Sequence, residues 1–305
     1  MTFALALVPS QQWQALLGIY VLSVIGYSGG NLFYDSFLTN VADDRQMDLV
    51  SATGYGMGYL GGVAAFVIFL AAQLSFIVAA VWWIVFAWPL LRYGHQRYSV
   101  TAVRNPLTDS LRRLVMTFRH IKQYRRVTWF LVAYFFYIDG VDTIFTMATA
   151  IGKDMGVDTT TRMIFLLVVQ LIAFPFSLLY GWLARRTSSR AAVLTGICVY
   201  LFICLYALKL DSLFDFWFLA ILIGTSQGGL QALSRSYFGQ LISKEASSEF
   251  FGFYNILGKF SAILGPLVVG LVTQLTGKST IGIASLAVLF AVGLVVFLAL
   301  PQSSK

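Results

Sequence analysis

Long apolar stretches separated by short polar turns are the feature that most restricts what this chain can fold into. A membrane-spanning helix needs about 20 apolar residues. Nine stretches of suitable length lie at residues 12–38, 54–74, 76–92, 127–150, 161–183, 190–209, 214–239, 249–276 and 280–300. The 305 residues are 58% hydrophobic and 11% charged, whereas a soluble domain carries about 25% charged residues. The sequence therefore predicts an all-α polytopic membrane protein with about nine full transmembrane helices.

The first eight residues, MTFALALV, are apolar but too short to cross a bilayer. No Lys or Arg precedes them, which is not typical of a signal peptide. We expect them to form a partial helix, the end of a segment whose beginning lies before residue 1.

The net charge of +8 is explained by where the basic residues lie rather than by nucleic acid binding. Many of them fall between residues 92 and 126. They are Arg92, Arg97, Arg104, Arg112, Arg113, Arg119, Lys122, Arg125 and Arg126. Cytoplasmic loops of membrane proteins carry this excess. The sequence thus predicts a multi-pass protein of a bacterial cytoplasmic membrane, with 39–53, 93–126, 184–189, 240–248 and the C-terminus in the cytoplasm.

Residues 93–126 form the one long polar connection, and they divide the chain. Leucine, valine, phenylalanine and isoleucine recur there at helical spacing with basic residues between them. This pattern predicts a basic amphipathic helix on the membrane surface; a calmodulin-like target helix is the alternative. We therefore expect a remnant of an N-terminal helical half at 1–92 and a six-helix C-terminal half at 127–305.

An internal repeat supports the division. GYSGGNLFYDSFL in the first block and GTSQGGLQALSRSYFGQL in the second are each followed by a polar turn and a glycine-rich stretch opened by serine. Gly29-Gly30 aligns with Gly228-Gly229. Parallel repeats of six helices are the architecture of major facilitator transporters.

Four segments carry a family resemblance: SATGYGMGYLGG, FLVAYFFYIDGVDTIF, QGGLQALSRSYFGQLI and SSEFFGFYNILGKFSAILGPLV. They resemble the vacuole-effluxer-like branch of the major facilitator superfamily, whose fungal members are associated with amino-acid export from the vacuole. The resemblance implies a twelve-helix fold in two halves around a central cavity, here truncated at the N-terminus. One loop departs from the superfamily pattern. Gly181 and Arg186 of GWLARRTSSR match the gate motif, but Arg185 occupies the place of its acidic residue.

Two acidic residues and one lysine are predicted deep within the membrane. Asp139 and Asp142 lie about 18–22 Å along their stretch, and Lys259 lies about 15 Å along another, at a rise of 1.5 Å per residue. The resemblance makes these helices neighbours. We expect a buried Asp–Lys pair or a proton-accepting aspartate tuned by Lys259, with a purely structural ion pair as the alternative. Gly140 allows a local helix break beside Asp139.

Other polar residues complete the candidate sites. Gln227, Gln231 and Asn255 are candidates for binding a zwitterionic solute, or else they form interhelical hydrogen bonds. Tyr254, Asn31 and Tyr34 are further candidates for the same cavity. Gate candidates are Arg235, Glu249, Asp35 and Arg186. An Arg235–Glu249 contact would close the cytoplasmic side, unless Arg235 instead extends to lipid headgroups.

These features favour a secondary transporter of a small polar solute, with amino acids as the candidate class, working by alternating access with proton coupling. The patterns do not indicate an enzyme, a metal site, a cofactor or a nucleic acid partner. Two alternatives remain open: a non-transporting fragment or helix-bundle interaction protein, and a channel.

Overall fold

The computed structural model describes residues 1–9, 11–72, 75–98 and 123–301, and their regular structure is helical. The helices are α1 (Thr2–Leu5), α2 (Trp13–Val41), α3 (Met47–Ala72), α4 (Ser75–Tyr93), α6 (Arg125–Asp154), α7 (Thr159–Arg186), α8 (Ser189–Tyr206), α9 (Leu213–Leu241), α10 (Ser247–Ser261), α11 (Leu264–Thr276), α12 (Ser279–Ser285) and α13 (Ala287–Leu298). A 3₁₀ turn, Ala207–Lys209, follows α8.

Each apolar stretch predicted from the sequence corresponds to one helix or to two consecutive helices. Eight helical segments within the described residues are long and apolar enough to cross a membrane. Helix α3 is a further long segment of 26 residues, about 39 Å at 1.5 Å per residue. The prediction of an all-α polytopic fold is confirmed. The amphipathic helix predicted within 93–126 lies mostly outside the described residues.

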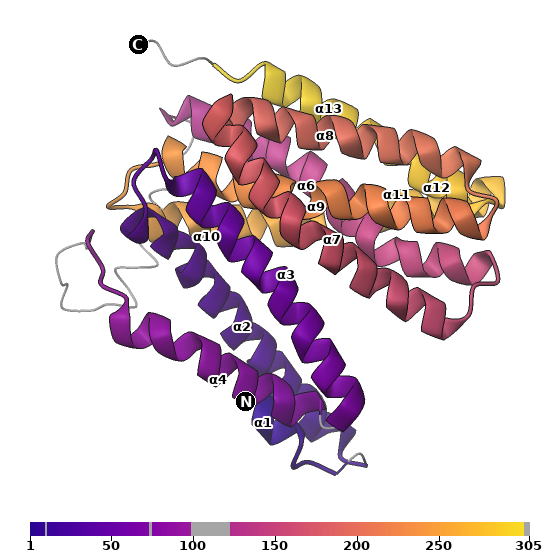
Figure 1. Ribbon diagram of the computed structural model, residues 1–305, viewed down its shortest axis with the longest axis horizontal. Helices are drawn as coiled ribbons and strands as arrows, with labels where there is room; N and C mark the ends of the chain where they lie inside the picture. The colour runs from indigo at the N-terminus through magenta and orange to yellow at the C-terminus, as the bar shows by residue number, and fades with distance from the viewer. Residues whose placement is uncertain (10, 73–74, 99–122, 302–305) are drawn as a thin grey trace.

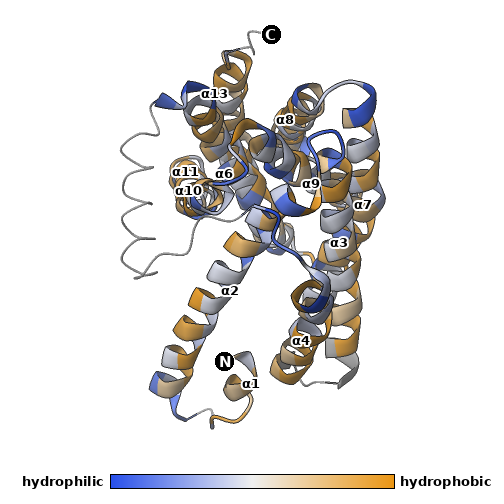
Figure 2. Ribbon diagram, turned by 90° about the vertical axis from the view of Figure 1, so that its left-hand side faces the viewer, coloured by the Kyte–Doolittle hydropathy of each residue, from blue (hydrophilic) through white to orange (hydrophobic). Residues whose placement is uncertain are grey.

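The helices form two groups in space (Figure 1), and their apolar segments differ in burial. Helices α6–α13 enclose the main core cluster, which extends along the chain from Val127 to Leu300. The most apolar part of α6 is 61% buried, whereas that of α2 is 0% buried and that of α4 is 6% buried. Figure 2 shows α2, α3 and α4 extending from the α6–α13 body, with apolar residues along their length. Polar contacts between the groups are therefore concentrated on a few helices.

Helix α3 makes the closest approach between the two groups, because it lies against α7 and α9. A Cβ added to Gly181 would lie 2.6 Å from the Cβ of Ala52. The Ser177 hydroxyl donates to the Ala52 carbonyl oxygen at 2.7 Å. Small residues let helix backbones approach closely in membranes. Helix α2 in turn packs against α10.

The connections 42–46 and 242–246 lie at the same end of the molecule, which we call the contact end. Lys244 and Asp44 form an exposed ion pair there, with 3.3 Å between Nζ and Oδ1. Nearby, the Asn40 side-chain oxygen accepts from the backbone N–H groups of Arg97 and Tyr98, both at 2.9 Å. These bonds fix the start of the long connection against the end of α2.

The helix break is found in a different place from the predicted one. Helix α6 continues through Gly140, where the ring of Phe290 packs so closely that an added Cβ would lie 2.5 Å from it. The stretch predicted at 249–276 instead divides between α10 and α11. Pro266 lies in the first turn of α11 and has no N–H to continue a helix from α10. The expected break beside Asp139 is therefore wrong.

Candidate functional site

Arg235 of α9 joins the two groups inside the molecule. Its side chain is only 4% exposed, and its Nη1 lies 3.1 Å from Oδ1 of Asp35 on α2. Nε donates to the Ser51 hydroxyl at 2.9 Å, and Nη2 donates to the Ser51 carbonyl oxygen at 3.3 Å. The guanidinium carbon lies 4.8 Å from the ring centre of Tyr55 and 5.3 Å from that of Tyr34. Arg235 thus binds α2 and α3 to α9.

Asp35 also contacts a second helix of the α6–α13 group. Its Oδ2 accepts from Asn255 Nδ2 on α10 at 3.1 Å. Arg235 therefore pairs with Asp35 and not with Glu249 as predicted. The alternative of an arginine extending to headgroups is also wrong, because the guanidinium is buried and fully engaged. A buried ion pair is stable when further hydrogen bonds satisfy both partners, as they do here.

Asp142 is linked to the first group through two side chains. Gln231 Nε2 on α9 donates to Asp142 Oδ1 at 3.4 Å, and Gln231 Oε1 accepts from the Tyr59 hydroxyl on α3 at 2.9 Å. The Tyr59 ring reaches this position across Gly228, where an added Cβ would lie 2.8 Å from it. We call Tyr59, Gln231 and Asp142 the relay. It connects an intramembrane carboxylate of α6 to α3, the helix of the first group that lies against α7 and α9.

Asp139 occupies a different environment, although it lies three residues from Asp142. It is 0% exposed, its Oδ1 accepts from the Thr143 hydroxyl at 3.4 Å, and its Oδ2 has no hydrogen-bond partner among the described residues. The backbone amide of Gly265 approaches the same carboxylate. Gly265 lies in the first turn of α11, where free N–H groups and the helix dipole favour a negative charge. Asp139 therefore lies beside the start of α11, with its Oδ1 2.8 Å from the place of an added Cβ at Gly265.

Lys259 does not pair with either aspartate. It is exposed, and its ammonium donates to the Ser28 hydroxyl on α2. Lys259 and Asn255 are four residues apart and share a face of α10, and this face points to α2. The predicted Asp–Lys pair is therefore wrong, because the face that carries Lys259 is turned away from α6.

Gln227 lies one turn from Gln231 on the same face of α9. It is 6% exposed, and its Oε1 is buried without a hydrogen-bond partner among the described residues. A buried acceptor without a partner costs about 1–3 kcal/mol. This oxygen therefore retains an unused capacity to accept a hydrogen bond.

The remaining sequence candidates contribute less to this set of contacts. Tyr254 stacks on Tyr134 with 4.2 Å between ring centres, inside the α6–α13 group. Asn31 is half-buried on α2. Arg186 is exposed and lies over the ring of Trp182, one turn earlier in α7, at 5.4 Å.

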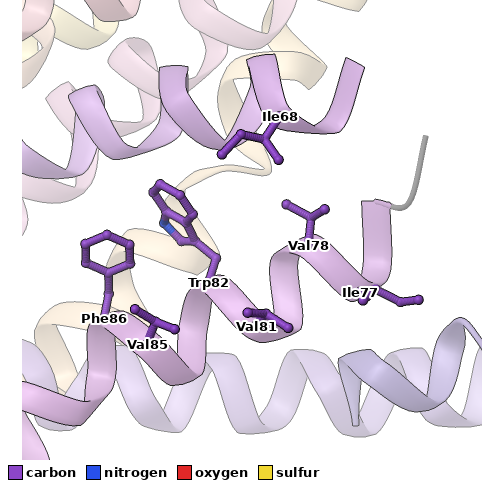
Figure 3. Close-up of a pocket in the computed structure, with 7 residues that line it drawn as sticks. All are labelled: Ile68, Ile77, Val78, Val81, Trp82, Val85 and Phe86. Carbon is purple, nitrogen blue, oxygen red and sulfur yellow. The ribbon is translucent and has the colours of Figure 1, made fainter. Parts of the chain in front are cut away.

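An apolar hollow of about 340 Å³ lies between α3 and α4 (Figure 3). Its lining residues are Ile68, Ile77, Val78, Val81, Trp82, Val85 and Phe86. Trp82 projects into the space from α4 and Ile68 faces it from α3. The lining contains no ionisable side chain, so this hollow does not serve as a site for a charged solute.

Sequence reasoning missed four residues that also make contacts between the groups: Asp48, Ser51, Tyr55 and Tyr59. All four lie on α3 at intervals of three or four residues, which places them along one face of a helix. That spacing of polar and aromatic residues in the glycine-rich stretch is the sequence pattern that could have identified them.

The comparison with protein families covers the whole chain. The family model described as "Vacuole effluxer Atg22 like" matches residues 1–305. The chain belongs to this family. One relative, "Uncharacterized MFS-type transporter YxiO" of Bacillus subtilis (strain 168), is 44% identical over 321 residues, which cover 100% of this chain and 75% of the relative. "Autophagy-related protein 22-1" of Aspergillus niger is 27% identical, and the match covers 79% of this chain and 45% of that protein.

Solved structures of transporters share the fold of this chain. The transporter FucP in the outward conformation superposes with a TM-score of 0.64 at 14% identity, covering 89% of this chain and 72% of that one. A bacterial homologue of the iron transporter ferroportin in the outward-facing state gives a TM-score of 0.61 at 15% identity, covering 96% and 74%. This family member is therefore an integral, multi-pass membrane protein of the major facilitator type, and its relatives are transporters rather than enzymes.

Proposed function

We propose that this family member moves a small polar solute by alternating access, with helices α1–α4 and α6–α13 as the two moving bodies. The observation that carries the proposal is the line of buried polar contacts between those groups, from the Arg235–Asp35 pair to the relay. Charged residues in a membrane span are costly and mark pathways for solutes and ions.

The contact end faces the cytoplasm in this proposal. The long basic connection begins there, beside Asn40, and basic connections remain on the cytoplasmic side. The contacts of Arg235 then close the cytoplasmic side, which agrees with the outward conformations of the two structural neighbours. In this proposal the membrane is a cytoplasmic membrane, and the C-terminus lies in the cytoplasm.

The solute that fits best is an amino acid. Asp142 and the free Gln227 oxygen are acceptors suited to an ammonium group. Lys259 is a cation on α10 that is not consumed by an ion pair in the described part of the chain, and it suits a carboxylate. In the described contacts neither charge neutralises the other, so each remains available to an oppositely charged group of a solute.

Asp142 is the preferred group for proton coupling. It is only partly buried and contacts the first group through Gln231 and Tyr59. A change in its charge would therefore alter a contact between the moving bodies. Asp139 is buried against the start of α11, and the described residues give it no comparable route to the first group.

The test is uptake of a panel of labelled amino acids, amines and carboxylic acids into proteoliposomes, with and without an inward proton gradient. We expect saturable uptake of amino acids that the gradient stimulates. Asp142→Asn should remove the stimulation, whereas Asp211→Asn, at an exposed loop position, should preserve it.

Each other outcome has a defined meaning. Stimulation that survives in both Asp142→Asn and Asp139→Asn contradicts proton coupling through these residues. Uptake that does not saturate favours a channel. Absence of uptake across the whole panel contradicts the transport proposal and favours a non-transporting helix bundle, an alternative that the exposed apolar faces of α2 and α4 also suit.

A further inference from the structure

Asp48 lies in the first turn of α3, and its carboxylate is held by residues of the other group. Its Oδ2 accepts from the Ser189 hydroxyl at 2.6 Å, and its Oδ1 accepts from the Ser236 hydroxyl at 2.6 Å. Gln240 Nε2 donates to Oδ1 at 3.2 Å. Asp48 is 6% exposed. Three donors from α8 and α9 thus converge on one acidic side chain of α3.

The cluster adjoins the loop between α7 and α8, which has no acidic residue at the position where the gate motif has one. In the segment that resembles the gate motif, Arg185 stands where an acidic residue is expected. Asp48 bonds to Ser189, the first residue of α8, directly after that loop. A carboxylate beside a helix N-terminus is also favoured by the helix dipole. Asp48 of the first group thus places an acidic side chain beside this loop.

We propose that Asp48 is a positioning residue of the transport cycle: a latch between the two groups that forms when the contact end closes and is released when it opens. The inference rests on the alternating-access proposal. An ionised carboxylate accepts hydrogen bonds only, so its two oxygens can serve all three donors at once. The donors are neutral hydroxyl and amide groups, which exchange readily with water when α3 moves away from α8 and α9.

The test measures the contact end itself, and it needs neither solute nor proton gradient. Spin labels on Arg45→Cys and Thr187→Cys report the separation across the contact end, because both positions are exposed and lie on opposite groups. Replacement of Cys198 and Cys204 by alanine leaves these labels unique. In detergent or nanodiscs, the unmodified cluster should give a mainly short distance. Asp48→Ala should raise the ratio of the long to the short population by about tenfold or more.

Matched variants separate a latch from a general loss of stability. Ser189→Ala and Ser236→Ala should each raise the ratio of the long to the short population, but by less than Asp48→Ala does. When either serine substitution is combined with Asp48→Ala, the further rise should be smaller than the rise that the serine substitution causes alone. Asp43→Ala, at an exposed neighbouring carboxylate, should leave the distances unchanged. Asp48→Glu, which keeps the acceptor, should restore part of the short population.

A fall in melting temperature of Asp48→Ala with an unchanged distance distribution would overturn the latch and leave Asp48 as a structural residue only. An equal shift in Asp43→Ala would also overturn it. A failure of proton-stimulated uptake would contradict the proposed function without affecting these distances, so the two proposals fail separately.

Discussion

The buried ion pair at the contact end makes a quantitative prediction for Asp35→Asn. Asparagine keeps the shape of the side chain but removes the charge opposite Arg235, whose side chain is 4% exposed, while that of Asp35 is 13% exposed. A buried charge that has lost its partner destabilises the state that buries it by about 3–5 kcal/mol. In a state open at the contact end, water reaches Arg235 and much of that penalty disappears. At about 1.4 kcal/mol per factor of ten, the lower limit corresponds to roughly a hundredfold shift toward the open state.

The exposed pair at the same end provides the control. Asp44, with 60% of its side chain exposed, pairs with Lys244 at 3.3 Å, and exposed pairs contribute about 0.2–1 kcal/mol. Asp44→Asn should therefore shift the equilibrium by no more than about fivefold. Spin labels across the contact end measure both variants under identical conditions. A shift in Asp35→Asn no larger than that in Asp44→Asn would refute the reasoning, because burial would then not determine the strength of the pair.

Three further predictions follow from local geometry. Gly265→Ala places a Cβ 2.0 Å from the Thr143 hydroxyl oxygen, so thermal unfolding should show a loss of about 1–3 kcal/mol of stability. Gly270→Ala is the control, because a Cβ added there has no atom within 4 Å, and it should be neutral. Lys259→Gln should raise the KM for zwitterionic solutes in proteoliposomes. The melting temperature should change little, because Lys259 is exposed and bonds only to a hydroxyl in the described contacts. An equal rise in KM for amines that lack a carboxylate would contradict this role. Asp158 is the N-cap of α7, and hydrogen bonds from the hydroxyl and the backbone N–H of Thr161 lower its pKa. The stabilisation from Asp158 should be present above the unfolded pKa of about 3.9 and be lost as the pH falls through the lower folded pKa. Equal melting temperatures of Asp158→Ala and the parent at pH 7 would contradict this prediction.

Depth along a helix was predictable from the sequence, whereas pairing was not. Asp139, Asp142 and Lys259 were expected near the middle of the membrane because each residue advances a helix by 1.5 Å. A partner also requires the rotation of each helix and the identity of its neighbour. The α10 face that carries Lys259 turns to α2, and the start of α11 occupies the space beside Asp139. Arg235 was singled out from the sequence as a gate candidate, but its partner lies 200 positions away on α2.

By itself, the sequence determined that the chain crosses a membrane many times, where most helices begin and end, and which family its motifs resemble. These properties depend on the length of apolar runs and on local patterns, which act over a few turns of helix. Only the tertiary structure decided which polar residues meet: Arg235 with Asp35, Gln231 with Asp142 and Tyr59, and Asp48 with the serines of α8 and α9. Those contacts depend on how α3 packs between α7 and α9. Helix packing of this kind is set by side-chain shape over the whole interface rather than by any one segment.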